Sequence, residues 1–119
     1  MLVVVALHWI ASFKGYYWTT SWYDIMMHFL GGLFVFIAAL WALNTQYAAK
    51  LAPYITLRNL LIFVFVVGFL WEAHEIVLKF ADVNEAGYSP DTIDDLINDM
   101  LGAGLAAFIF RKSIPRKIQ

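Results

Sequence analysis

The 119-residue chain is 62% hydrophobic and only 14% charged, with a formal net charge of −1, a balance typical of membrane proteins rather than soluble domains. It contains no cysteine, which excludes disulfide bonds, thiolate metal sites and thiol catalysis. Outside the C-terminal tail there is no basic stripe, so we expect no nucleic-acid partner. The apolar N-terminus lacks a basic n-region and a cleavage site, so we do not expect a removable signal peptide.

Four apolar segments predict an all-α fold: a polytopic membrane protein built as a four-transmembrane-helix bundle with a short first helix, in one domain covering residues 1–119. A spanning helix needs about 20 apolar residues. The first segment is shorter, so it spans only by including the aromatic stretch that follows it, or else inserts partly. The predicted helices cover about 1–18, 24–43, 57–80 and 92–110, and a basic tail covers 111–119.

Aromatic and basic residues in the connections predict how the helices sit in the membrane. Tryptophan and tyrosine are abundant between the first two helices, where they favour the membrane interface. Lys50, Arg58 and the basic tail lie on one side if all four helices cross. The positive-inside rule then predicts a protein integral to the cytoplasmic (inner) membrane, with the N-terminus and C-terminus in the cytoplasm.

In this topology, acids and histidines gather at the outer end of the bundle. Asp24 begins the second helix and His28 lies one turn deeper, while Glu72 and Glu75 lie near the outer end of the third helix. Asp99 lies in the second turn of the fourth helix. At 1.5 Å per residue, these side chains fall within about 11 Å of the outer end. Glycine pairs at 31–32 and at 102 and 104 would let neighbouring helices approach closely.

Carboxylates packed together in a membrane cannot all stay ionised without a positive partner. They can bind a cation, hold protons or line water, and their mixture with histidine on facing helices favours a cation. The predicted metal ligands are Asp24, His28, Glu72, Glu75 and Asp99, with Asp95 as candidate catalytic base. Candidates for supporting contacts to these ligands are His74, His8, Asp91, Asp94 and Asn98.

Plainer roles compete with several of these assignments. Asp24, Asp91 and Asp94 are placed to cap helix starts and complement helix dipoles. The two glutamates could belong to a satisfied buried polar network. If an ion binds, the absence of cysteine and the presence of histidine favour zinc, manganese or iron, with magnesium and calcium as alternatives.

Three motifs carry a resemblance to a known family. The sequences WYDIMMHFLGG, WEAHE and SPDTIDDLINDMLGAG resemble the YjdF-like bacterial inner-membrane proteins, which show Asp-x-x-x-His before glycine, Trp-Glu-x-x-Glu, and Asp-Thr-x-x-Asp-x-x-x-Asp in this order. The resemblance covers roughly residues 22–104, and typical relatives are longer, with more spanning helices. It implies that the family's polar positions are Asp24, His28, Glu72, Glu75, Asp91, Asp95 and Asp99.

The His-Phe step and the last Asp-x-x-x-Asp-x-x-Gly are also similar, more distantly, to VanZ-like proteins, which are associated with glycopeptide-antibiotic resistance. The YjdF-like resemblance implies no settled activity. Three functions therefore stay open: an outer-face metal site, in a catalytic version acting on a lipid or lipid-linked substrate; a proton or divalent-cation transporter formed by a homo-oligomer; and a structural or partner-binding protein with a metal-free polar network.

Overall fold

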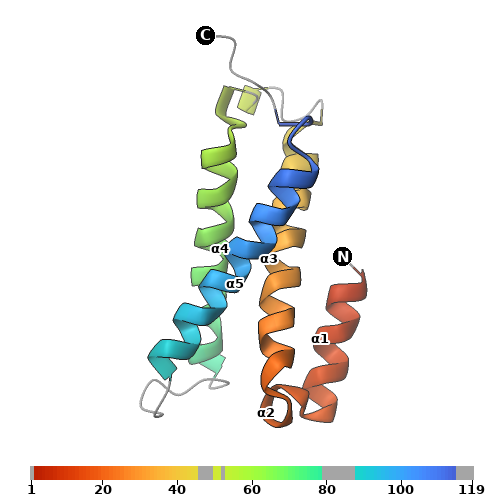
Figure 1. Ribbon diagram of the computed structural model, residues 1–119, viewed down its shortest axis with the longest axis vertical. Helices are drawn as coiled ribbons and strands as arrows, with labels where there is room; N and C mark the ends of the chain where they lie inside the picture. Colours follow the sequence, from red (N-terminus) through yellow and green to blue (C-terminus); the bar gives the residue numbers. More distant parts are fainter. Residues whose placement is uncertain (1, 46–49, 52, 79–87, 115–119) are drawn as a thin grey trace.

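The computed structural model describes residues 2–45, 50–51, 53–78 and 88–114, and these form an all-helical structure (Figure 1). Three long helices run along the long axis of the molecule, and a shorter helix lies beside the N-terminal half of the first of them. The helices are α1 (Leu2–Lys14), α2 (Tyr16–Thr19), α3 (Ser21–Leu43), α4 (Leu57–Leu78) and α5 (Tyr88–Ile109).

The helix predicted over residues 1–18 is interrupted. Gly15 has φ 71° and ψ 23°, a left-handed conformation that glycine adopts without steric cost, and α1 therefore ends at Lys14. The single turn α2 follows, and Thr20 then leads the chain back into α3. α3 and α5 begin earlier than predicted, at Ser21 and Tyr88. Residues 79 and 80, the predicted end of the third helix, lie outside the described part.

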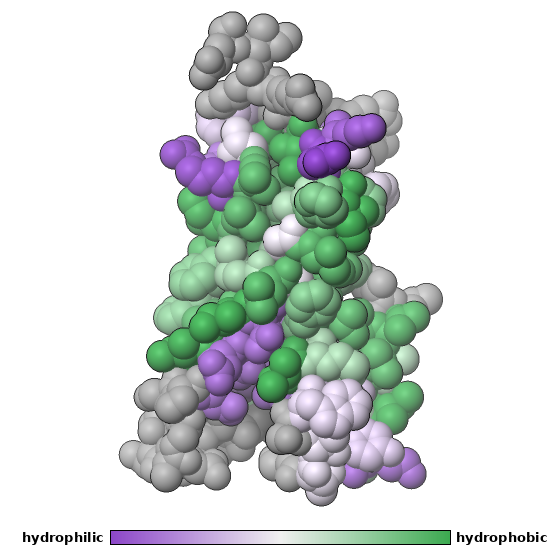
Figure 2. Space-filling view, in the orientation of Figure 1, coloured by the Kyte–Doolittle hydropathy of each residue, from purple (hydrophilic) through white to green (hydrophobic). Residues whose placement is uncertain are grey.

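Within the described residues, α3 and α4 are the two helices long and apolar enough to cross a membrane, over Trp22–Leu43 and Leu57–Leu78. Less than a third of either span is buried inside the protein, and Trp41 and Phe69 are 72% and 58% exposed. Figure 2 shows the corresponding hydrophobic band between two more hydrophilic ends. A soluble protein rarely exposes so large an apolar surface, so this band is suited to lipid. α5 is also long, with 22 residues, but its acids lower its mean hydropathy.

The larger apolar core lies in the half of the bundle distant from α2, and a smaller cluster of Ala11, Tyr23 and Met27 lies near α2. The larger core joins the C-terminal halves of α3 and α5 to the N-terminal half of α4, because these segments meet at the same end. Phe36 is fully buried there, with Leu60 and Val64 almost so. The buried members are Phe36, Leu40, Ile55, Leu60, Val64, Ala103 and Ala106.

Glycines bring α3 and α5 into backbone contact near the middle of both helices. A Cβ atom on Gly32 would collide with the backbone carbonyl of Asp99, and one on Gly102 would collide with the carbonyl oxygen of Phe29. The predicted close approach at these glycines is confirmed. It is wrong for Gly104, which is exposed and where an added Cβ atom would meet no facing atom of the described residues within 4 Å. This backbone contact determines which turns of α3 lie beside the acids of α5.

Candidate metal centre

Four carboxylates from three helices surround the imidazole ring of His28. Its Nε2 atom lies 3.7 Å from Asp24 Oδ1 and 3.8 Å from both Glu72 Oε1 and Asp95 Oδ2. Its other nitrogen, Nδ1, lies 3.5 Å from Asp99 Oδ2. We refer to these five residues as the His28 cluster.

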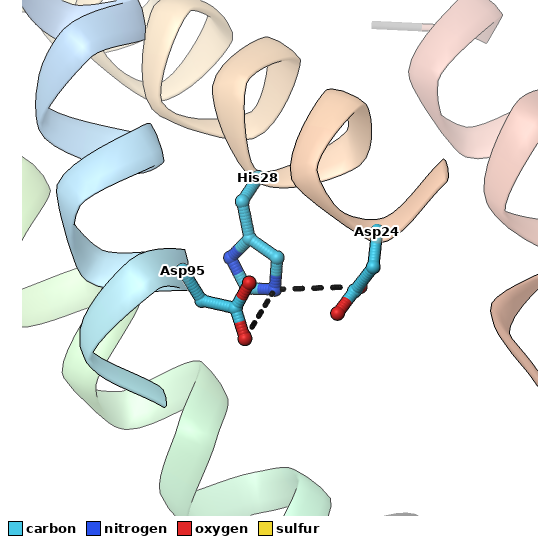
Figure 3. Close-up of side chains that lie close together, drawn as sticks. All are labelled: Asp24, His28 and Asp95. Atoms are coloured by element: carbon cyan, nitrogen blue, oxygen red, sulfur yellow. Dashed lines mark ion pairs between the residues drawn. The ribbon is translucent and has the colours of Figure 1, made fainter. Parts of the chain in front are cut away.

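Helical spacing explains how the cluster forms. Asp24 and His28 lie four residues apart on α3, and Asp95 and Asp99 lie four apart on α5, so each pair shares a helix face. In Figure 3, the His28 ring lies between Asp24 of its own helix and Asp95 of α5. Glu72 joins from α4, whose C-terminal half lies at the same end of the bundle as the N-terminal halves of α3 and α5.

The cluster combines deep burial with unbalanced charge. His28, Glu72, Asp95 and Asp99 are between 4% and 7% exposed, and Asp24 is partly exposed. Among the described residues, no lysine or arginine forms an ion pair with these acids. With all four carboxylates ionised, even a protonated imidazole would leave three net negative charges. Since isolated buried charge is costly, the cluster needs protons or a bound cation.

The distances at Nε2 suit ligands around one ion better than direct hydrogen bonds. N–H···O hydrogen bonds usually measure about 2.7–3.2 Å, whereas neighbouring ligands of a tetrahedral zinc with bonds near 2.1 Å lie about 3.4 Å apart. One ligand atom each from Asp24, His28 and Asp95 lies within 4.8 Å of the other two. Glu72 Oε1 is buried and has no hydrogen-bond partner among the described residues. These four side chains could therefore hold a divalent ion after small movements.

Asp99 occupies a niche made by glycines, on the opposite side of the His28 ring from the other acids. A Cβ atom on Gly68 of α4 would collide with Asp99 Oδ2, and one on Gly31 would lie 3.6 Å from Oδ1. Facing Nδ1 rather than Nε2, Asp99 is placed to orient the imidazole, as carboxylates behind metal-bound histidines do. Gly68 was not predicted as a site residue, although a glycine one turn before Glu72 in an apolar run was a usable signal.

The structure does not bring Glu75 into the cluster. Glu75 accepts a 2.9 Å hydrogen bond from Trp71 Nε1 on its own helix. His8 is also outside, with Nδ1 2.8 Å from the Tyr17 hydroxyl. His74 is exposed, and its ring centroid lies 5.2 Å from that of Trp71.

The remaining candidates on α5 also lie outside the cluster. Asp91 and Asp94 are exposed, and the Asn98 amide donates a 2.7 Å hydrogen bond to the backbone carbonyl of Asp94. Sequence reasoning missed Thr92, whose Oγ1 is buried without a hydrogen-bond partner among the described residues. Thr92 stands in the Asp-Thr-x-x-Asp-x-x-x-Asp motif, which was the available signal for it.

A cavity of about 270 Å³ reaches the cluster from the side of α1, lined by α1, α2, α3 and α4 together with Asp99 of α5. Its walls are mainly apolar, and Asp24, His28 and Asp99 form part of them. Tyr17 lines the same cavity. Burial, and secondarily the negative charge of Asp24, raise the pKa of Tyr17 above its usual range.

Exposed apolar helices around a buried group of acids and one histidine define an all-helical membrane protein with an internal polar site. The chain belongs to the family described as "Predicted membrane protein (DUF2238)", which it matches over residues 1–115. The YjdF-like proteins are this family, so that resemblance is confirmed, whereas the VanZ-like similarity is not supported. No curated protein and no solved structure matches the chain.

Proposed function

We propose that this chain is a four-span inner-membrane protein that binds a divalent cation in the His28 cluster, near the outer face of the membrane. One observation carries the proposal. Three carboxylates from three helices converge on Nε2 of one buried histidine, without an arginine or lysine among the described residues to balance them. A cation removes the charge imbalance and uses the buried oxygen of Glu72 that has no hydrogen-bond partner.

The proposed placement in the membrane combines the three long helices with the shorter α1. The two apolar spans α3 and α4 are completed by α1 and by α5, whose deeper acids, Asp95 and Asp99, are buried in the bundle rather than exposed to lipid. Arg58, Arg111 and Lys112 lie at the end of the bundle opposite the cluster. The positive-inside rule predicts that this end lies in the cytoplasm with the C-terminus. We propose that the N-terminus is cytoplasmic as well, although the shorter α1 lies beside only the N-terminal half of α3.

The proposed ligands are His28 Nε2 and oxygens of Asp24, Asp95 and Glu72, while Asp99 orients the ring through Nδ1. This revises two roles: Asp95 becomes a ligand rather than a separate base, and Asp99 becomes an orienting residue. One nitrogen with several oxygens suits zinc, manganese or iron, and magnesium or calcium would suit a site that used the carboxylates alone.

Metal content of the purified protein tests this proposal. The parent protein, incubated with Zn²⁺ or Mn²⁺ and then freed of excess ion, should retain about one ion per chain by elemental analysis. The double variant Asp24→Asn, Asp95→Asn should retain almost none. Asp94→Asn is the matched control, because it removes an exposed carboxylate next to Asp95. Equal metal content in the double variant and the parent would refute the site.

The cavity beside the cluster supports a catalytic role for the ion. Asp24 is partly exposed and lines the cavity, so the ion would keep one side open to a ligand, as catalytic metal sites do. Such an ion lowers the pKa of bound water and supplies a nucleophile at neutral pH. At this depth the natural substrate is a lipid or lipid-linked molecule. Metal-dependent release of a water-soluble headgroup from lipid vesicles, absent in the double variant, would support this reaction class.

Transport through a single subunit is disfavoured by the apolar core. Phe36, Leu60 and Val64 fill the other half of the bundle with almost no exposed surface. A cation pathway would have to run between the subunits of a homo-oligomer. Cation flux into proteoliposomes is expected to be absent, and a flux lost on Asp95→Asn would favour transport instead.

A further inference from the structure

The cavity next to the cluster has apolar walls and a polar end whose charged groups are acidic. Asp24, Glu75 and Asp99 line it, and none of its described lining residues is lysine or arginine. Val5 and Trp71 are 45% and 40% exposed, so the cavity is open to the outside of the protein, where the proposed topology places lipid. Apolar side chains of α1, α3 and α4 form its walls, including Val4, Met27, Val35, Val64 and Val67.

Aromatic rings and one carboxylate are joined at the polar end. The Tyr17 hydroxyl lies 2.8 Å from His8 Nδ1, and the His8 ring meets Trp71 edge-on at a centroid distance of 5.6 Å. Trp71 Nε1 donates a hydrogen bond to Glu75 Oε1. This connection ties α1 and α2 to α4 across the cavity. Glu75 keeps further acceptor capacity, because its carboxyl group has two oxygens and Trp71 uses only Oε1.

We propose that this cavity binds the ammonium headgroup of a membrane amphiphile, with a hydrocarbon chain along the apolar walls. An ammonium group gains from the Glu75 carboxylate and from the faces of aromatic rings such as those of Tyr17 and Trp71. Without a bound ion, an anionic headgroup would be repelled by Asp24, Glu75 and Asp99 and would find no lysine or arginine among the described lining residues. In a bacterial membrane, the ligand with matching chemistry is a phospholipid with a primary amine. Binding of this lipid in the cavity does not require the metal ion.

Lipid retention from membranes of defined composition tests this proposal. The protein is reconstituted in nanodiscs of equimolar phosphatidylethanolamine and phosphatidylglycerol with identical acyl chains, and the retained lipids are identified by native mass spectrometry. We expect phosphatidylethanolamine to be enriched about three- to tenfold, the range that a cation–π and carboxylate contact supports. Glu75→Gln, which keeps an oxygen for Trp71 but removes the charge, should abolish the preference.

A second variant tests the chain-binding part separately. Val67→Trp fills the apolar part of the cavity and should lower retention of both lipids, whereas Asp94→Asn should behave like the parent. Equal retention of the two lipids by the parent, an unchanged preference in Glu75→Gln, or full retention in Val67→Trp would each overturn the proposal. Metal content measured on the same samples separates the two proposals: Glu75→Gln should lose the lipid preference and keep its metal.

Discussion

His28 and Asp99 pair inside the bundle, with Nδ1 of the imidazole 3.5 Å from Oδ2 of the carboxylate. The pairing directs the opposite nitrogen, Nε2, toward the other three acids of the cluster. If Nδ1 carries the proton and faces Asp99, Nε2 is left with its lone pair toward the proposed ion. The two residues come from different helices, so the relationship depends on how α3 and α5 pack.

Replacing the orienting carboxylate should weaken metal binding without abolishing it. Asp99→Asn keeps the size of the side chain but removes the negative charge behind His28, and losses of such partners typically cost about 10- to 100-fold in metal affinity. The measurement is competition for Zn²⁺ against a chelator of known affinity. Affinity equal to that of the parent would show that Asp99 has no orienting role, and complete loss would indicate that it is a ligand.

The glycines between α3 and α5 should differ sharply in their tolerance of alanine. At Gly32 or Gly102 a Cβ atom would collide with the backbone of the opposite helix, so the helices must separate. We expect a loss of about 1–3 kcal/mol or more in the free energy of unfolding, as in other overpacked interiors. Thermal unfolding in detergent measures the effect.

Gly104 supplies the matched control for that comparison. It lies on the same helix as Gly102 and is exposed, and a Cβ atom added there would meet no facing atom within 4 Å in the described part of the chain. Gly104→Ala should be neutral or raise stability by up to about 1 kcal/mol through helix propensity. Similar melting temperatures for Gly102→Ala and Gly104→Ala would contradict the backbone contact.

A substitution at Gly68 should distinguish an effect on metal binding from an effect on the stability of the bundle. In Gly68→Ala the added methyl group would collide with the Asp99 carboxylate, a side chain that can move. We therefore expect weaker metal binding with a smaller loss of stability than in Gly32→Ala. Gly31→Ala, whose Cβ would lie 3.6 Å from Asp99 Oδ1 in ordinary contact, should bind metal like the parent. The reverse order of affinities would contradict the described niche.

Single cysteines test the number of crossings, because the chain has no cysteine of its own. Thr19 and Ser113 are exposed and flank α3, α4 and α5. If all three helices cross, a membrane-impermeant maleimide should label Thr19→Cys in spheroplasts and Ser113→Cys only after lysis. If only α3 and α4 cross, both positions would lie on the same side and label together.

Local sequence signals were enough to predict the helices and much of the site. Length and hydropathy identified four helical segments, and spacing placed Asp24 with His28 and Asp95 with Asp99 on shared faces. They did not predict the break at Gly15, although a glycine with φ of 71° is a common helix end. They also did not separate Glu72 from Glu75, which lie on neighbouring parts of the α4 surface.

The sequence by itself determined the membrane character, the helical class and the end of the bundle where the acids collect, since composition and helical period are properties of single segments. Only the tertiary structure decided that Glu72 rather than Glu75 meets His28, whereas the contact of Glu75 with Trp71, four residues earlier on α4, is local. The reason is rotation: spacing shows which residues share a helix face, but packing at Gly32, Gly68 and Gly102 decides which face turns inward and how close the helices come.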